Sequence, residues 1–337
     1  MRLPPKLTDA AIRAAVLSHY NLAITTLTFL PIGNDLLSFV YRAEASDGRS
    51  YLLKLRAEQG FRAPSLLIPR FYYEQGVPHI VAPVPTSDQR LWVPMGNFAL
   101  MLYPFLDART AAAAGLSEQH WHELGATMQQ VHTSPLPPEL QQMLRRETFI
   151  PWRRELLDEI EAKIVRNEVS GPAQQELSAF WRAHQDQIQA VIARADTLSA
   201  QLRQADLTPA LCHADLHTWN ILLDTERQVW LIDWDEIILA PKERDLMFVI
   251  GGIGRDLVSA RETECFLQGY GDPAIDWRAL TYYRYAWAVQ DMAAYAEEVF
   301  LPNHPEEARA DAVRGFIAQF EPGNIVEIAS ASDEHLR

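Results

Sequence analysis

Cysteine is scarce in this chain of 337 residues, because only positions 212 and 265 carry it. Two thiols cannot build a disulfide framework, and such a composition is typical of a reducing compartment. Long apolar runs are missing as well, since the longest, around residues 98–106, is far shorter than a membrane span. The first residues have no apolar core or cleavage site of a secretory signal. We therefore expect a cytoplasmic protein and exclude membrane, secreted and fibrous proteins.

Positive charge is also in short supply. Thirty Lys and Arg stand against 44 Asp and Glu, which gives a formal net charge of −14. Such an acidic chain is a poor partner for the phosphate backbone of nucleic acids. Residues 1–107 contain ten basic and eight acidic residues, so the remainder carries 20 basic and 36 acidic ones. This later acidic excess is compatible with solvated helix faces and with a site that attracts cations.

The hydrophobic pattern of the first hundred residues predicts mainly strands. Short runs rich in β-branched and aromatic residues are separated by turn signals, and Asp47-Gly48 marks a tight hairpin. Strands are expected at 25–32, 38–45, 49–56, 79–85, 90–95 and 98–105, with one inserted helix at 64–75. A first helix is expected at 8–20, capped by Thr8 or Asp9.

After Asp107 the apolar residues recur at helical spacing. One helix is expected to start at Ser117 and another at Pro151, which suits a first helical turn. Further helices are expected at 172–195, 261–270, 277–300 and 306–320. A chain of this length normally forms more than one core. We therefore predict an α+β protein with an antiparallel sheet lobe at 1–102, a connection at 103–107 and a mainly helical lobe at 108–337.

One polar stretch interrupts the helical pattern. It contains His213, Asp215 and Asn220 between two apolar, strand-like runs, as in a loop held by a β-hairpin, and Asp233 follows thirteen residues after Asn220. Phosphoryl transfer uses such a set, because one carboxylate accepts the proton of the attacking hydroxyl while a carboxamide and a second carboxylate hold Mg²⁺. Mg²⁺ needs only a few oxygen ligands from the protein. The spacing therefore predicts a kinase.

A zinc site is a second interpretation of the same loop. His213, Asp215 and His217 offer donor atoms that Zn²⁺ accepts. The segment that follows contains carboxylates but no further His or Cys at a zinc-like spacing. We therefore favour phosphoryl transfer over a zinc hydrolase.

The pattern His-x-Asp-x-x-x-x-Asn at 213–220, followed by Ile-Asp-Trp at 232–234, resembles the catalytic loop and metal-binding motif of protein-kinase-like enzymes. Without the protein kinases' Arg, it is similar to the aminoglycoside phosphotransferases and their choline-kinase relatives. Segments at 241–248, 269–271 and 324–329 resemble the spectinomycin phosphotransferase branch. The resemblance implies a bilobal protein-kinase-like fold, with an N-terminal nucleotide-binding lobe and a hinge at 103–107, and an ATP- and Mg²⁺-dependent kinase.

The resemblance also implies roles for individual residues. Asp215 is the implied catalytic base, and Asn220 and Asp233 are the implied magnesium ligands. Support of the catalytic loop is implied for His213 and Asp245. Lys54, centred between leucines on the third strand, has a charge that needs a reason to be buried. Nucleotide contacts are implied for Lys54, Gly33, Ser38, Met101, Tyr103 and Phe105.

Two features depart from the family pattern. The loop that would cover the phosphates, residues 32–38, has a single glycine. Residues 64–73 of the inserted helix contain no Glu to pair with Lys54, and Glu58 and Glu74 are poorly placed for it. A nucleotide-binding module without turnover is therefore a competing hypothesis from another class.

Carboxylates near the motif favour a small cationic acceptor. Asp235 and Glu236 directly follow a metal ligand, Asp291 lies on the helix at 277–300, and Trp219 offers a ring that packs or stacks on a substrate. Glu236 is alternatively a partner of a basic residue at 242 or 244. By resemblance the acceptor is an aminocyclitol or aminoglycoside antibiotic such as spectinomycin, inactivated by phosphorylation of a hydroxyl. The alternative is a metabolic kinase of choline, a methylthioribose-like sugar or another amino alcohol.

Overall fold

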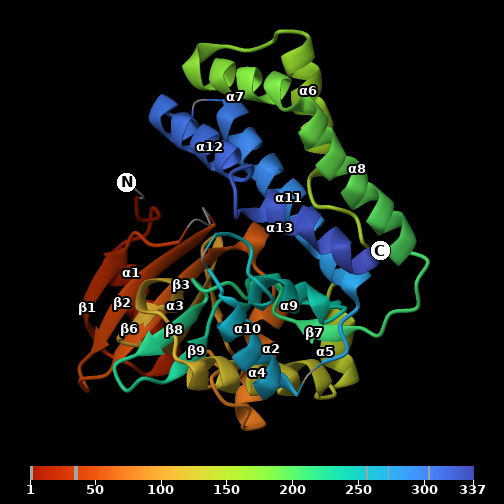
Figure 1. Ribbon diagram of the computed structural model, residues 1–337. Helices are drawn as coiled ribbons and strands as arrows, with labels where there is room; N and C mark the ends of the chain where they lie inside the picture. The colour runs from red at the N-terminus through yellow and green to blue at the C-terminus, as the bar shows by residue number, and fades with distance from the viewer. Residues whose placement is uncertain (1–2, 34–36, 256, 272, 303) are drawn as a thin grey trace. The chain divides into compact units, whose positions relative to one another are not determined.

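The computed structural model describes residues 3–33, 37–255, 257–271, 273–302 and 304–337 (Figure 1). Its fold is α+β, as the sequence predicts, and the chain forms two compact units. The first comprises Met1–His120, Thr127–Leu144 and Thr218–Ile237, and the second comprises Trp121–Ala126, Arg145–His217 and Ile238–Arg337. The first unit thus includes residues 218–237, which we expected to belong to the helical part. Residues 34–36, in the loop expected to cover phosphates, lie outside the described residues.

The first unit contains a five-stranded antiparallel sheet, with its first strands in red and orange in Figure 1. Its strands, in spatial order, are β1 (Ile24–Leu30), β2 (Ser38–Ala45), β3 (Ser50–Ala57), β5 (Phe98–Pro104) and β4 (Val93–Met95). The β2–β3 hairpin turns at Gly48, whose φ of 85° suits glycine. A short 3₁₀ turn, η1 (Glu58–Gly60), and helix α2 (Pro64–Glu74) follow β3.

Alternation along the sheet decides which side chains enter the core. Leu53 and Leu55 of β3 are fully buried with Leu100 and Leu102 of β5, and helix α1 (Asp9–Tyr20) packs on the same face. The Thr8 hydroxyl accepts the N–H of Ala11 at 3.2 Å and caps α1, as expected. Because successive side chains of a strand point to opposite faces, Lys54 and Arg56 lie on the other face of β3.

The strand expected at 79–85 is wrong. This segment forms only isolated bridges, one from Ile80 to Leu231 and one from Val84 to Leu102. Pro83 and Pro85 have no backbone N–H, so a continuous ladder of hydrogen bonds is not available here.

A second, three-stranded sheet completes the first unit. It joins β6 (Ala108–Thr110), β8 (Ile221–Asp224) and β9 (Val229–Leu231) in the order β6-β8-β9. The remaining elements are α3 (Ala111–Ala114), α5 (Pro138–Met143) and the 3₁₀ turn η2 (Trp234–Glu236). Helix α4 (Glu118–Thr133), capped by Ser117, contributes residues to both units.

The second unit is mainly helical and is built around α11 (Trp277–Phe300), which matches the predicted span. The Asp276 carboxylate caps α11 by accepting the N–H groups of Arg278 and Ala279. Side chains on all sides of α11 are buried, which is normal for a helix packed against several others. Its neighbours are α6 (Arg154–Val165), α7 (Gly171–Ala183), α8 (Gln185–Leu202), α9 (Glu243–Val249), α12 (Glu306–Ala318), α13 (Ile325–Ala331) and the 3₁₀ turn η3 (Ser332–Leu336).

Two predicted helices of this unit need correction. The helix at 172–195 is divided into α7 and α8, because His184 leaves helical geometry and its ring stacks on Phe180 at 4.0 Å between centroids. The helix expected from Pro151 begins only at Arg154, after Arg153 adopts a left-handed φ of 57°. Helix α10 (Ala260–Tyr270) lies where it was predicted.

The expected hairpin around the polar loop is also wrong. Strand β7 (Ala210–Cys212), which precedes the loop, pairs with β10 (Ile238–Ala240), whereas β8, which follows the loop, pairs with β6 and β9. The two ends of the loop therefore belong to different sheets. Among the described residues, none of the helices combines the length and apolar character that crossing a membrane requires.

Candidate active site

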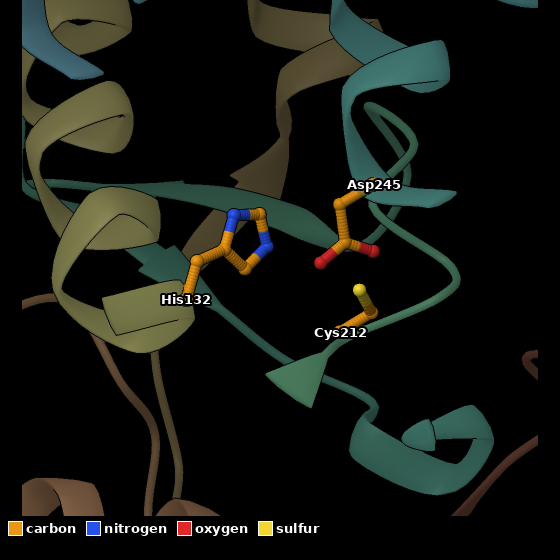
Figure 2. A group of neighbouring side chains, drawn as sticks. All are labelled: His132, Cys212 and Asp245. Atoms are coloured by element: carbon orange, nitrogen blue, oxygen red, sulfur yellow. The ribbon is translucent and has the colours of Figure 1, made fainter. Parts of the chain in front are cut away.

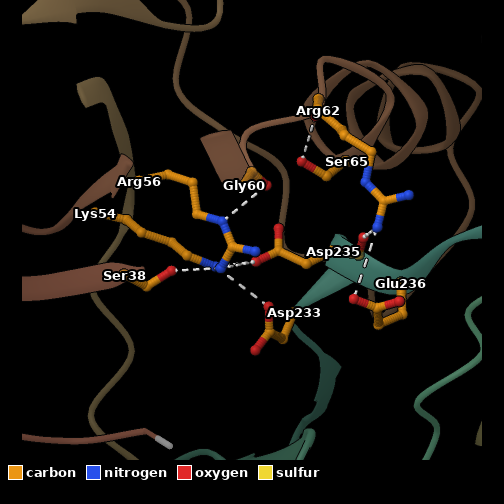
Figure 3. Close-up of polar contacts among 9 residues, drawn as sticks. All are labelled: Ser38, Lys54, Arg56, Gly60, Arg62, Ser65, Asp233, Asp235 and Glu236. Carbon is orange, nitrogen blue, oxygen red and sulfur yellow. Dashed lines mark hydrogen bonds and ion pairs between the residues drawn. The ribbon is translucent and has the colours of Figure 1, made fainter. Parts of the chain in front are cut away.

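In the first unit, Lys54 meets two carboxylates from the segment after β9. Its Nζ lies 2.8 Å from Oδ2 of Asp235 and 3.2 Å from Oδ1 of Asp233 (Figure 3). Burial disfavours the charge on Lys54, but these two carboxylates outweigh that cost and raise its pKa above the ordinary value. The ammonium group is therefore held in its charged form among acidic partners.

Asp235 is shared between two cations of β3. Besides Lys54, it contacts Nη1 of Arg56 at 3.2 Å. Burial alone would raise the pKa of Asp235, but Lys54 and Arg56 more than compensate and lower it. Arg56 in turn donates to Oγ of Ser38 at 2.7 Å and to the Gly60 carbonyl at 3.0 Å. These contacts form one ionic cluster on the Lys54 face of the sheet.

Local backbone geometry presents the two aspartates. Asp233 adopts a left-handed φ of 62°, and η2 starts directly after it with a buried Trp234. The Ile232 N–H donates to the Asn220 carbonyl at 3.1 Å, which ties this segment to the end of the polar loop. Asn220 and Asp233 thus offer a carboxamide and a carboxylate oxygen from one unit. This all-oxygen donor set fits Mg²⁺ better than a softer metal.

Of the other predicted nucleotide residues, Ser38 joins this cluster, and Met101 and Tyr103 lie on β5. Met101 is opposite Lys54 in the ladder and is buried, and burial raises the pKa of the neighbouring Tyr103. The Phe105 ring lies 4.7 Å from the Arg42 guanidinium. Ser38 is buried and bonded to Arg56, and Gly33 has a φ of 79° next to residues outside the described range.

Three residues predicted to contact the acceptor also belong to this unit. Asp235 forms ion pairs with Lys54 and Arg56. Glu236 has an ionic contact with Arg62, at 3.7 Å. Trp219 is 49% exposed, which is unusual for so large an aromatic side chain.

In the second unit, a strained loop presents Asp215. Ala214 adopts a left-handed φ of 67°, a conformation that costs a residue with a Cβ on the order of 1 kcal/mol. Oδ1 of Asp245 accepts the Ala214 N–H at 2.6 Å, and its Oδ2 accepts the His213 N–H at 2.8 Å. Nδ1 of His213 accepts the Asp215 N–H at 3.3 Å. The buried side chains of Asp245 and His213 therefore hold the backbone of the loop that contains Asp215.

Figure 2 shows the Asp245 carboxylate beside Sγ of Cys212, at the end of β7. Burial raises the pKa of the Cys212 thiol well above its usual range, and Asp245 adds to the effect. The neutral thiol donates to the carbonyls of Ala240 and Pro241 at 3.5 and 3.4 Å. Cys212 therefore serves as a packed, protonated neighbour of Asp245.

The Asp215 carboxylate has two notable neighbours. Its Oδ1 lies 3.3 Å from Nε2 of His217. The second neighbour is Asp291 of α11. Burial and, to a smaller extent, repulsion from the Asp215 charge raise the pKa of Asp291 to about 7. A hydrogen bond with Trp287 acts in the opposite direction and lowers this pKa. The unit thus places two carboxylates in mutual electrostatic contact.

The zinc interpretation has no support in the described residues. His213, Asp215 and His217 do not converge as a three-ligand group there, and Nδ1 of His213 is engaged by backbone. The residues that sequence reasoning missed are Arg56 and the ionic role of Asp235. Their signals were a second basic residue two positions after Lys54 and three acids within residues 233–236.

Residues 28–283 match the model of the Phosphotransferase enzyme family. The chain belongs to this family. The phosphotransferase is 31% identical to the spectinomycin phosphotransferase APH(9)-Ia, whose crystal structure contains ADP and spectinomycin; the match covers 98% of this chain and 100% of that one, with a TM-score of 0.89.

More distant relatives share less with this phosphotransferase. Protein StrN of Streptomyces griseus is 23% identical over 303 residues, which are 88% of this chain and 86% of StrN. A choline kinase of Streptococcus pneumoniae, 15% identical with a TM-score of 0.56 over 92% and 98% of the two chains, shares the fold. The predictions of the aminoglycoside phosphotransferase family, the kinase-like fold and a phosphotransferase are confirmed.

Proposed function

We propose that this phosphotransferase transfers the γ-phosphoryl group of ATP to a hydroxyl group of a cationic aminocyclitol, with spectinomycin as the leading acceptor. The observation that carries the proposal is the 31% identity, over 98% of the chain, with an enzyme whose structure contains ADP and spectinomycin. The ionic cluster of the first unit supplies residues that bind the nucleotide. The loop of the second unit that Asp245 and His213 hold supplies Asp215 for proton transfer.

On the nucleotide side, Lys54 contacts the α- and β-phosphates. Gly33 and Ser38 lie at the phosphates, and the backbone at Met101, Tyr103 and Phe105 binds the adenine. Asn220 and Asp233 hold Mg²⁺, which when bound neutralises charge on the phosphate oxygens. Asp233, with a side chain that is 45% exposed, is the more accessible aspartate of the cluster.

Asp215 accepts the proton of the acceptor hydroxyl. The hydroxyl oxygen then bonds to the γ-phosphorus while the bond from that phosphorus to the β–γ bridging oxygen breaks, and ADP leaves. His217, 3.3 Å away, orients the Asp215 carboxylate. Asp245 and His213 act through the backbone, because they hold the loop at Ala214 in the conformation that presents Asp215.

Asp291 gives the acceptor side its preference for cations. A carboxylate with a pKa of about 7 is half ionised near neutrality, and an ammonium group of the acceptor stabilises its charged form. Trp219 and Glu236 are further proposed acceptor contacts, since both side chains are about half exposed. Asp235 we assign instead to the nucleotide side.

An ADP-release assay with MgATP and spectinomycin tests the proposed chemistry. Wild-type enzyme should release ADP only when the acceptor is present, and Asp215→Asn should lose at least a thousandfold in turnover while its affinity for MgATP changes less than threefold. A loss below tenfold would contradict the role of Asp215 as base. MgATP binding without acceptor-dependent turnover would favour a nucleotide-binding module.

A further inference from the structure

The structure leaves Lys54 without an acidic partner on helix α2. The only Glu of α2, Glu74, is at the last position and pairs with Arg70 at 2.7 Å, four residues earlier on the same helix. Glu58 of η1 is exposed to solvent. The carboxylates that contact Lys54 lie 179 and 181 positions later in the sequence, at Asp233 and Asp235.

We infer that Asp235 is the positioning residue that holds Lys54 toward the nucleotide phosphates, in the place that a helix carboxylate would otherwise take. The inference rests on the proposed function, because it assumes that Lys54 binds the phosphates of ATP. It separates the two aspartates by role: Asp235 anchors the lysine, and Asp233 remains available to the metal.

Geometry favours Asp235 over Asp233 as the anchor. Asp235 is the nearer partner of Lys54, 2.8 against 3.2 Å, and its side chain is less exposed, 23% against 45%. Its carboxylate is also fixed by a second cation, since Arg56 lies 3.2 Å away. A short charge-assisted bond in a sheltered position is the stronger restraint on a flexible lysine.

Arg56 makes this anchor rigid. Its guanidinium contacts Asp235 while it donates to Ser38 on β2 and to Gly60 in η1, so three segments hold one side chain (Figure 3). Lys54 and Arg56 are two residues apart on one strand and share a face, which lets a single carboxylate bridge both. A lysine without this bridge would keep only Asp233, and that contact competes with both metal and phosphate.

The test compares Asp235→Asn with Asp47→Asn, a control that removes a carboxylate paired with Arg49 in the β2–β3 turn. Titration calorimetry measures binding of MgATP, of ATP in EDTA and of adenosine. We expect Asp235→Asn to weaken MgATP about tenfold, to weaken metal-free ATP by a similar factor, and to leave adenosine unchanged, because adenosine has no phosphate for Lys54 to bind. Asp47→Asn should match wild type for all three.

Other outcomes overturn the inference. Unchanged or tighter ATP binding by Asp235→Asn would show that Asp235 does not position Lys54. A loss seen with MgATP but absent in EDTA would make Asp235 a metal ligand, and an equal loss of adenosine affinity would point to general damage to the first unit. If the wild type binds ATP no more tightly than adenosine, this result contradicts both the proposed function and this inference.

A second set of variants covers the case in which Asp235→Asn folds poorly. Asp235→Glu keeps the charge and should retain ATP affinity within about threefold. Lys54→Met should lose as much ATP affinity as Asp235→Asn, and the double variant should lose no more than either single one, since both act through the same contact. Additive losses would contradict the proposed dependence of Asp235 on Lys54.

Discussion

Asp245→Asn tests how the loop that carries Asp215 is held. The wild-type carboxylate is fully buried and accepts two backbone N–H groups, from His213 at 2.8 Å and from Ala214 at 2.6 Å. Asparagine keeps the size of the side chain but has one oxygen and one NH₂ group. The NH₂ group must face a backbone N–H, so one of the two donors loses its acceptor.

The size of the effect follows from these two bonds. A hydrogen bond to a charged group contributes about 1.5–3 kcal/mol, and a buried donor without an acceptor costs about 1–3 kcal/mol. Asp245→Asn should therefore destabilise the second unit by about 2–3 kcal/mol. At about 2–4 °C per kcal/mol, the melting temperature should fall by about 5–10 °C.

Differential scanning calorimetry without ligands measures the shift. Asp311→Asn is a matched control, because Asp311 pairs with Arg314 on the exposed surface of α12, where an ion pair contributes at most about 1 kcal/mol. Its melting temperature should stay within about 2 °C of wild type. If Asp245→Asn melts like this control, the two bonds do not hold the loop and the reasoning is refuted.

Three further predictions concern other parts of the molecule. Gly125→Ala should destabilise the protein by about 1–3 kcal/mol in chemical unfolding, because its Cβ would collide with the Phe266 carbonyl of α10; a variant as stable as wild type would contradict this close helix crossing. The pKa of Asp291 is about 7 in the folded protein, against an ordinary value of 3.8. Between pH 3.8 and pH 7 the folded protein therefore binds more protons at this group than the unfolded chain does, so the free energy of unfolding falls as the pH rises through this range. The melting temperature of Asp291→Asn minus that of wild type should therefore increase from pH 5 to pH 8. A difference that stays constant with pH would refute the raised pKa. Asp233→Asn should weaken MgATP at least tenfold but ATP in EDTA little, as measured by calorimetry, and equal losses would contradict its role as a metal ligand.

Local signals made several elements predictable. Asp47-Gly48 indicated the β2–β3 hairpin, and the helix 277–300 was predicted at its observed bounds from its apolar residues. The loop that we propose to be catalytic stands out by its residue types and spacing, since His213, Asp215 and Asn220 lie within eight positions.

Features that depend on distant contacts were not predictable in this way. The Lys54–Asp235 pair joins residues 181 positions apart. A local sequence pattern does not predict which distant carboxylate a lysine on a strand contacts. The break between α7 and α8 arises from the backbone of His184 and its stack on Phe180, in a stretch whose apolar periodicity continues. The missing strand at 79–85 shows that β-rich composition is insufficient where prolines remove donors.

The most direct test of the central claim is phosphorylation of spectinomycin itself. Wild-type enzyme with MgATP is assayed for ADP release against spectinomycin, several aminoglycosides, choline and methylthioribose, and the products are identified by mass spectrometry. We predict one phosphate on spectinomycin and a kcat/KM for it at least a hundredfold above that for choline. Turnover of choline or methylthioribose with none of spectinomycin would contradict the proposed acceptor.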